Sequence, residues 1–217
     1  MKALLEVAVV SVEEAIEAES LGAARLEVCI HLDVGGTTPP PALVAAIRDA
    51  VTIPLAVLVR PRPGDFTYSH HEFAQMRHEL DASAEAGAHD VVIGAITRDG
   101  LIDMSGMTPL VDRARELGLG VAFHRAFDRV RDPLEEIETL LDLGIDRILT
   151  SGGAPTAIEG KEVLRMLVER AGKDLTILAG GGVRANNVRE LVRYTSAREV
   201  HCRASAAAEV LRKLQSS

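Results

Sequence analysis

The sequence contains no tryptophan, only two cysteines and few other aromatic residues. Cys29 and Cys202 lie far apart in the chain, so a disulfide framework is not expected. The 24 basic residues are outnumbered by 32 acidic ones, and the formal net charge is −8. This balance argues against a protein that binds the nucleic-acid backbone, because such proteins need a basic face. Only four of the basic residues are lysines, and none ends an apolar run, which disfavours Schiff-base aldolase chemistry.

Long apolar segments are also missing. No apolar run approaches the roughly 18–20 residues that a membrane helix needs, and Glu6 interrupts the first run before a signal peptide could develop. No Gly-x-Gly-x-x-Gly motif follows that run, so no nucleotide cofactor is expected. These absences together predict a reduced, cytoplasmic protein without a membrane or nucleic-acid partner.

The sequence does contain a regular alternation of short apolar runs and segments with helical spacing. The apolar runs are expected strands at about 4–10, 25–29, 53–59, 90–94, 118–123, 147–150, 175–179 and 199–202. The expected helices span about 12–21, 40–50, 73–86, 107–117, 134–143, 157–171, 187–194 and 206–214. Strict alternation predicts a parallel sheet. Eight such units favour an α/β fold of the (β/α)8 TIM-barrel type, as a single domain over residues 1–217. The alternative is an open doubly wound sheet, usually of about five or six strands.

Polar residues lie in or at the end of nearly every apolar run. Because side chains alternate along a strand, Arg25, Glu27 and Cys29 share one face of the second strand. Helices cover the outside of a barrel, so this polar face is expected to point inward. The set expected at the mouth of the barrel comprises Glu6, Glu27, Cys29, Arg60, Arg62, His124 and His201. Barrel enzymes place their active sites at this end, although a buried salt-bridge network that fixes the strand register would use the same residue types.

The run from Phe123 to Asp128 carries three catalytically able side chains where a buried strand is expected to end. His124 is a candidate general acid or base, and Asp128 is the candidate carboxylate that orients it. Glu27 and Glu6 are the other candidate catalytic residues.

Arginines and glycines supply a candidate site for an anion. Arg60 and Arg62 suit bidentate recognition of carboxylate or phosphate, and their structural alternative is pairing with Glu6 and Glu27. The Gly180-Gly181-Gly182 turn follows the seventh expected strand, where barrel enzymes often hold phosphate on backbone amides. The full set of expected ligand-binding residues is Arg60, Arg62, Arg125, Ser151, Gly152, Gly180, Gly181, Gly182 and His201.

Metal binding has less support from residue spacing. No pair of histidines or cysteines has the spacing of a structural zinc site. Cys29, His124 and His201 would converge only through the fold, and a thiol suits a soft ion such as Cu(I). Cys29 is therefore the candidate metal ligand, and Cu(I) is the metal expected there.

Several motifs resemble those of the CutC copper-homeostasis family. They are Leu26-Glu27-Val28-Cys29, Gly36-Thr37-Thr38-Pro39, the stretch from Arg60 to Ser69, the stretch from Phe123 to Asp128, Leu149-Thr150-Ser151-Gly152 and the stretch from Ala179 to Arg184. The resemblance implies a cytosolic TIM-barrel protein, often oligomeric, that is linked to copper tolerance and uses a cysteine at the position of Cys29 for Cu(I). A homodimer is therefore a possible assembly.

The chain departs from the family pattern after the eighth strand. The family usually has a long insertion there, whereas here His201-Cys202-Arg203-Ala204 runs almost directly into the last expected helix. Any lid or subunit contact built from that insertion is expected to be absent.

Two functions compete, and the sequence leaves open whether the protein is an enzyme. The first is CutC-like copper homeostasis through bound Cu(I). The second is a TIM-barrel enzyme of the isomerase, lyase or hydrolase type that acts on a small phosphorylated or carboxylated metabolite. A scaffold whose rim charges neutralise one another is the third reading.

Overall fold

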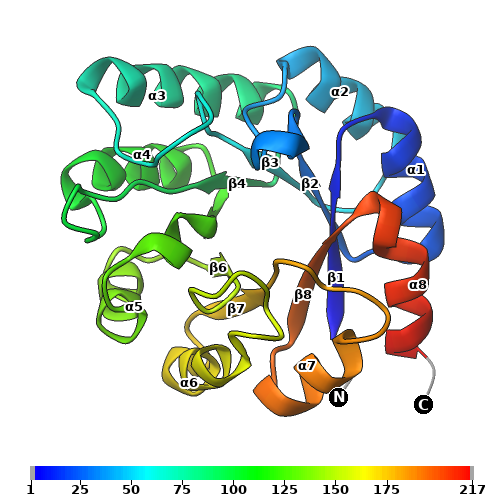
Figure 1. Cartoon of the computed structure of the whole chain (residues 1–217). Coiled ribbons are helices and arrows are strands. Elements are labelled where there is room, and N and C mark those ends of the chain that lie inside the picture. The colour runs from blue at the N-terminus through cyan, green and yellow to red at the C-terminus, as the bar shows by residue number, and fades with distance from the viewer. Residues whose placement is uncertain (1–2, 216–217) are drawn as a thin grey trace.

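The strands form a closed parallel barrel in which neighbours follow one another in sequence order, and β8 pairs with β1 to complete the ring. The computed structural model describes residues 3–215, and Figure 1 shows the helices arranged around the outside of the strands. The strands are β1 (Leu4–Val9), β2 (Arg25–Val28), β3 (Leu55–Leu58), β4 (Asp90–Ile93), β5 (Gly120–Phe123), β6 (Arg147–Thr150), β7 (Thr176–Ala179) and β8 (Glu199–Arg203).

The α-helices alternate with these strands along the described chain. They are α1 (Val12–Leu21), α2 (Pro41–Ala50), α3 (His70–Glu85), α4 (Met104–Glu116), α5 (Pro133–Asp142), α6 (Lys161–Ala171), α7 (Val188–Thr195) and α8 (Ala204–Gln215). Two short 3-10 helices, η1 (Leu32–Val34) and η2 (Arg125–Arg129), follow β2 and β5. The predicted TIM barrel is confirmed, and the open doubly wound sheet is excluded. The predicted domain span also includes residues 1–2 and 216–217, which lie outside the described residues.

Local sequence signals fix where several helices begin. Ser11 caps α1 by accepting a hydrogen bond from the backbone N–H of Glu14. Ser69 and Glu72 form a capping box, so α3 starts at His70, three residues before the start expected from apolar spacing alone.

Apolar side chains fill two separate regions of the barrel. The larger region lies between the outer face of the strands and the helices and contains most of the buried Leu, Ile and Val. The smaller lies inside the barrel and consists of Ala8, Cys29, Ala56, Leu58, Val92 and Ala122. Because most members of this inner cluster are small, the interior has room for polar side chains above and below them.

A layer of charged residues fills the amino-terminal end of the barrel. Arg25, Asp90, Arg147 and Glu199 are the first residues of the four even-numbered strands, and alternate strands typically contribute one such layer. Arg25 pairs with Glu199, and Nη2 of Arg147 lies 2.7 Å from Oδ1 of Asp90. These two ion pairs occupy the interior of the barrel at that end.

The last helix follows the last strand without an intervening loop. β8 ends at Arg203 and α8 begins at Ala204, as expected from the short segment in the sequence. Across residues 3–215, no helix combines the length and the apolar character needed to cross a membrane.

Candidate functional site

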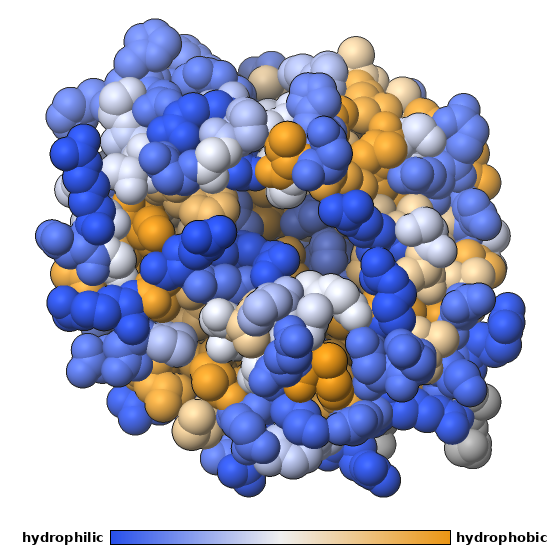
Figure 2. Space-filling model, in the orientation of Figure 1, coloured by the Kyte–Doolittle hydropathy of each residue, from blue (hydrophilic) through white to orange (hydrophobic). Residues whose placement is uncertain are grey.

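A cavity of about 410 Å³ opens at the carboxyl ends of the strands. In Figure 2 this face is hollowed near its centre, and mainly hydrophilic residues surround the hollow. The acidic and basic side chains on the cavity wall include Glu27, Arg60, Arg125, Arg184, His201 and Arg203. We call this space the mouth cavity.

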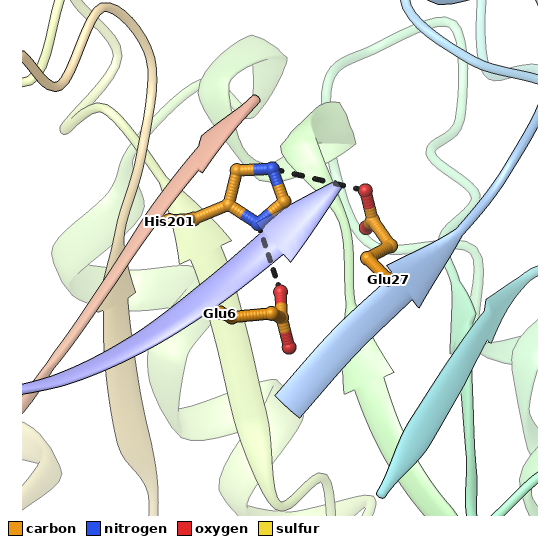
Figure 3. Close-up of side chains that lie close together, drawn as sticks. All are labelled: Glu6, Glu27 and His201. Atoms are coloured by element: carbon orange, nitrogen blue, oxygen red, sulfur yellow. Dashed lines mark hydrogen bonds and ion pairs between the residues drawn. The ribbon is translucent and has the colours of Figure 1, made fainter. Parts of the chain in front are cut away.

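Glu6, Glu27 and His201 meet inside the barrel, from β1, β2 and β8 (Figure 3). Glu27 and His201 line the mouth cavity, whereas Glu6 does not, and we call this group of three the floor. The strand register places Glu6 beside both Arg25 and His201 on the neighbouring strands. Nδ1 of His201 lies 2.8 Å from Oε1 of Glu6, and Arg25 donates through Nε to the other Glu6 oxygen. On the opposite side of the ring, Nε2 of His201 lies 3.8 Å from Oε2 of Glu27.

The two carboxyl groups of this floor have opposite pKa shifts. Burial alone would raise the pKa of Glu6, but its hydrogen bond with His201 and the charge of Arg25 outweigh burial and lower that pKa to about 2. Burial raises the pKa of Glu27 to about 7, because the charges of His201 and Arg25 offset only part of this effect. Burial would lower the pKa of His201, yet attraction to Glu27 and the bond to Glu6 raise it. Glu6 is therefore a fixed anion that accepts from His201, and Glu27 exchanges a proton near neutral pH.

The same three side chains also have the spacing of a metal site. One ligand atom from each of Glu6, Glu27 and His201 lies within 4.8 Å of the others. However, Arg25 and His201 already compensate the charge of Glu6. A metal ion bound there would compete with these two groups for the Glu6 carboxylate.

Arg125 from η2, Arg184 from the loop after β7 and Arg203 from the end of β8 also line the mouth cavity. Arg125 donates to Asp128 at 2.7 Å and to Ser151 at 3.0 Å, and Arg203 donates to the backbone carbonyl of Leu32 at 2.7 Å. The exposed Arg184 has a hydrogen bond to the adjacent backbone carbonyl at 2.8 Å. These arginines place positive charge at the opening of an otherwise acidic chain, although Arg125 is paired with Asp128.

Arg60 is a buried member of the cavity wall and is bound to the backbone. Its guanidinium donates to the carbonyls of Val34, Gly36 and Gly64 at 2.8–3.1 Å, and it lies over the Phe66 ring. Pairing with Glu6 or Glu27, the structural alternative, is not observed. Arg60 therefore fixes the loops after β2 and β3 and leaves its positive charge beside the cavity without a carboxylate partner among the described residues.

Arg62 does not line the mouth cavity, so its expected place in the site is wrong. It pairs with Glu72, lies 2.9 Å from Asp65 and packs over the Tyr68 ring. β3 ends at Leu58, so the alternation of side chains does not continue to residue 62.

Asp128 does not orient His124, which corrects the pairing expected from the sequence. The Asp128 carboxylate accepts from Thr150 at 2.6 Å and from the backbone N–H of Ser151 at 2.9 Å, in addition to Arg125. His124 Nδ1 instead accepts from the backbone N–H of Ala126 at 3.1 Å. Asp128 thus braces the turn after β6, and Ser151 belongs to this bracing network.

His124 lines the mouth cavity as a neutral ring. Burial lowers its pKa to about 3, and the nearby charge of Arg60 acts in the same direction. The ring packs against Phe66, with the two centroids 5.0 Å apart. At neutral pH His124 is therefore a hydrogen-bonding group and does not act as a cationic acid.

The glycine turn after β7 lies partly on the cavity wall. Gly181 and Gly182 line the cavity with φ values of +96° and +71°, which other residues rarely adopt. Gly180 does not line the cavity, but it packs closely against the lining residue Leu149, because a Cβ atom at position 180 would come within 2.4 Å of the Leu149 side chain. Gly152, also expected to bind ligand, is in the turn braced by Asp128 and is not among the lining residues.

Cys29 lies inside the barrel but outside the three-residue cluster with metal spacing. The side chain is fully buried. Burial raises the pKa of its thiol well above the usual range, and the charge of Glu27 adds to this effect. The thiolate that a metal needs is therefore disfavoured at this position.

Sequence reasoning did not select Arg184, Arg203 and Phe66 as site residues. Arg203 follows His201 by two positions in β8, so strand alternation would have placed it on the same face. Arg184 and Phe66 are in loops, and no periodic signal indicates where loop side chains lie.

The comparisons with known proteins agree on one family. The family model described as "CutC family" matches residues 3–206. A family protein CutC from Histophilus somni is 44% identical over 197 residues, which cover 91% of this chain and 80% of that protein. The human copper homeostasis protein cutC homolog is 40% identical over 214 residues, covering 99% of this chain and 78% of the human one.

Solved structures give the same result. The structure of a CutC protein from Streptococcus agalactiae superposes with a TM-score of 0.87 at 30% identity, and the match covers 92% of this chain and 97% of that one. A thiamine phosphate pyrophosphorylase from Pyrococcus furiosus shares the fold with a TM-score of 0.67 at 17% identity. The family match and the level of identity show that this chain belongs to the CutC family.

Proposed function

We propose that the protein is an enzyme that binds a small anionic metabolite in the mouth cavity and moves a proton on it with Glu27. The observation that carries this proposal is the cluster on the floor. Glu27 is buried and its pKa is about 7, and its carboxylate Oε2 lies 3.8 Å from Nε2 of His201. A general base works best when its pKa is near the working pH. Perturbed carboxyl groups of this kind occur preferentially at functional sites.

The remaining floor residues have positioning roles in this proposal. Glu6 holds His201 through Nδ1, so the other ring nitrogen is directed towards Glu27 (Figure 3). Arg25 keeps Glu6 ionised by pairing with it. His201 then stabilises the ionised form of Glu27 after it has given up its proton.

The arginines of the opening favour an anionic ligand. Arg125, Arg184 and Arg203 place positive charge around the opening, and Arg60 adds a buried charge on the wall. Guanidinium groups recognise phosphate and carboxylate oxygens well. A volume of about 410 Å³ is at the low end for ligand pockets, so the ligand is expected to be small.

Anion binding can be tested by thermal unfolding with inorganic phosphate and small phosphorylated sugars. A ligand at 100 times its dissociation constant adds about 2.7 kcal/mol of stability, which is about 5–10 °C in Tm for a chain of this size. Arg184→Gln should remove most of this shift. Arg165→Gln on α6, which pairs with Glu169 and does not line the cavity, is the matched control. Equal shifts in both variants, or no shift with any anion, would contradict the proposal.

A second candidate function is copper homeostasis through Cu(I) held by Cys29. The relatives from mouse and human carry copper homeostasis in their names, and Cys29 is a thiol beside the mouth cavity residues Ala8 and Leu58. Both cysteines are free, which fits a reducing cytoplasm. Cu(I) binding measured by competition with a chromogenic chelator should be lost in Cys29→Ser and kept in Cys202→Ser. Equal Cu(I) binding by the two variants would reject Cys29 as the ligand.

A further inference from the structure

One polar atom on the wall of the mouth cavity has no partner. His124 Nδ1 accepts a hydrogen bond from the Ala126 backbone, so the proton of the neutral ring is on Nε2. Nε2 is fully buried and makes no hydrogen bond within residues 3–215, although the ring belongs to the cavity wall. A buried donor without an acceptor costs free energy. This arrangement indicates a group held ready for an acceptor that a ligand supplies.

The ring is fixed in one chemical form. Its bond to Ala126 sets the tautomer, and its packing against Phe66 sets its orientation. Burial, with the positive charge of Arg60 nearby, keeps the ring neutral at pH 7. A neutral imidazole that donates from a fixed position can stabilise a developing oxyanion without giving up its proton.

We propose that His124 Nε2–H donates to a carbonyl oxygen of the substrate while Glu27 removes a proton from the adjacent carbon. This inference rests on the proposed function and adds to it a substrate class and a reaction. The substrate is an α-hydroxy aldehyde or ketone that carries a phosphate or carboxylate group. The reaction is an isomerisation that exchanges the carbonyl and hydroxyl positions.

The step balances without an added reagent. The C–H bond breaks, and its proton forms an O–H bond with the Glu27 carboxylate. The C–H electron pair becomes the second bond between the two carbons, and the carbonyl electrons move to the oxygen that His124 contacts. The positive charge of Arg60 also favours this enediolate. Glu27 then returns the proton to the neighbouring carbon, and the hydroxyl proton passes to the first oxygen, so no oxidant or reductant is needed.

Hydrogen–deuterium exchange tests the proton abstraction directly. The full-length protein is incubated in D2O with D-ribose 5-phosphate, D-fructose 6-phosphate or D-glucuronate, and loss of the C–H signal next to the carbonyl is followed by proton NMR. The first two probes carry phosphate and the third carries carboxylate, so the result also identifies the preferred anion. We expect enzyme-dependent exchange with at least one probe, and Glu27→Gln should abolish it.

Two variants of His124 separate its proposed role from a structural one. Glutamine can accept from Ala126 through Oε1 and donate through Nε2, so His124→Gln should retain much of the exchange. His124→Leu should lower the exchange rate about 10²–10³-fold, the usual loss for one oxyanion donor. His124→Leu should also leave the phosphate-induced rise in Tm unchanged, because Arg125, Arg184 and Arg203 at the opening are intact. Equal exchange rates in His124→Leu and the unaltered protein would overturn the inference.

A second measurement does not depend on choosing the right substrate. Nitrogen-15 NMR of the labelled protein should show His124 as the neutral Nε2–H tautomer from pH 5 to pH 8. A cationic ring or the Nδ1–H tautomer in that range would overturn the inference. If phosphate raises Tm but none of the probes exchanges, the isomerisation is wrong and anion binding still stands. If no anion raises Tm, the proposed function itself fails.

Discussion

Replacing Glu27 by glutamine should make the protein more stable at pH 8 while removing its proposed base. Burial raises the pKa of Glu27 from an ordinary value of 4.5 to about 7. Each pKa unit corresponds to about 1.4 kcal/mol, so ionising Glu27 costs about 3 kcal/mol more in the folded protein than in the unfolded chain. Because the folded pKa is the higher one, Glu27 causes no loss of stability below pH 4.5, and its ionisation lowers the stability by this amount as the pH rises to about 7.

Glutamine resembles the protonated acid and does not ionise, so the stability of the variant does not fall in this way as the pH rises. The difference in unfolding free energy between the variant and the unaltered protein should therefore grow by about 2–3 kcal/mol between pH 5 and pH 8. Glu6 does not contribute to this change, because its pKa of about 2 keeps it ionised throughout the range. Loss of the attraction between Glu27 and His201 reduces the gain, so about 3 kcal/mol is an upper value.

Urea unfolding at pH 5 and pH 8, with comparable m values, measures this difference. Glu17→Gln, on the exposed face of α1, is the matched control for the loss of one carboxylate. A stability difference for Glu27→Gln that does not change with pH would show that Glu27 ionises in the folded protein as it does in water. The assignment of Glu27 as the base would then lose its support.

Three further outcomes are expected. The rate of Glu27-dependent hydrogen exchange should rise as the pH increases through about 7, because the carboxylate is the active form, and a rate that falls over this range would contradict the role. Arg25→Met should destabilise the protein by about 3–5 kcal/mol in urea unfolding, since it leaves Glu6 and Glu199 without their buried partner. Gly180→Ala should lower the rate of hydrogen exchange on the substrate, because the new methyl group would lie about 3.2 Å from the Cβ of His201 and would clash with Leu149. A crystal structure of the variant in which His201 has not moved would refute this reasoning.

The alternation of strands and helices could be predicted because each apolar run and each amphipathic segment is a local signal. The expected strands agree with the structure to within a few residues, and capping residues explain one of the larger differences at a helix start. Apolar spacing placed the start of α3 at residue 73, whereas the Ser69–Glu72 capping box places it at His70.

The candidate site could be predicted only where residues belong to strands. Glu6, Glu27 and His201 were expected to face inward from strand alternation, and the structure brings them together. Arg62 was misplaced because it follows the end of β3, where the side-chain alternation stops. Asp128 was paired with His124 because the two lie in one short run of sequence, and the fold gives each of them other partners. Loop residues turn towards whichever backbone or carboxyl partner is in reach, and that partner is set by the tertiary fold.

The two ends of this barrel differ in how their inward-facing charges are paired. Both ends contain inward-facing arginines and carboxylates, so residue type does not separate them. At the amino-terminal end, Arg25 with Glu199 and Arg147 with Asp90 pair opposite charges within one layer. At the mouth, Arg60 has only carbonyl partners, Glu27 has a raised pKa, and His124 Nε2 has no acceptor. In the described part of the chain, buried polar atoms without a hydrogen bond occur at both ends, on Arg147 as well as on Arg60 and His124. The mouth differs in having a cavity, an arginine without a carboxylate partner and a carboxyl group with a raised pKa, and a ligand bound there would complete these groups.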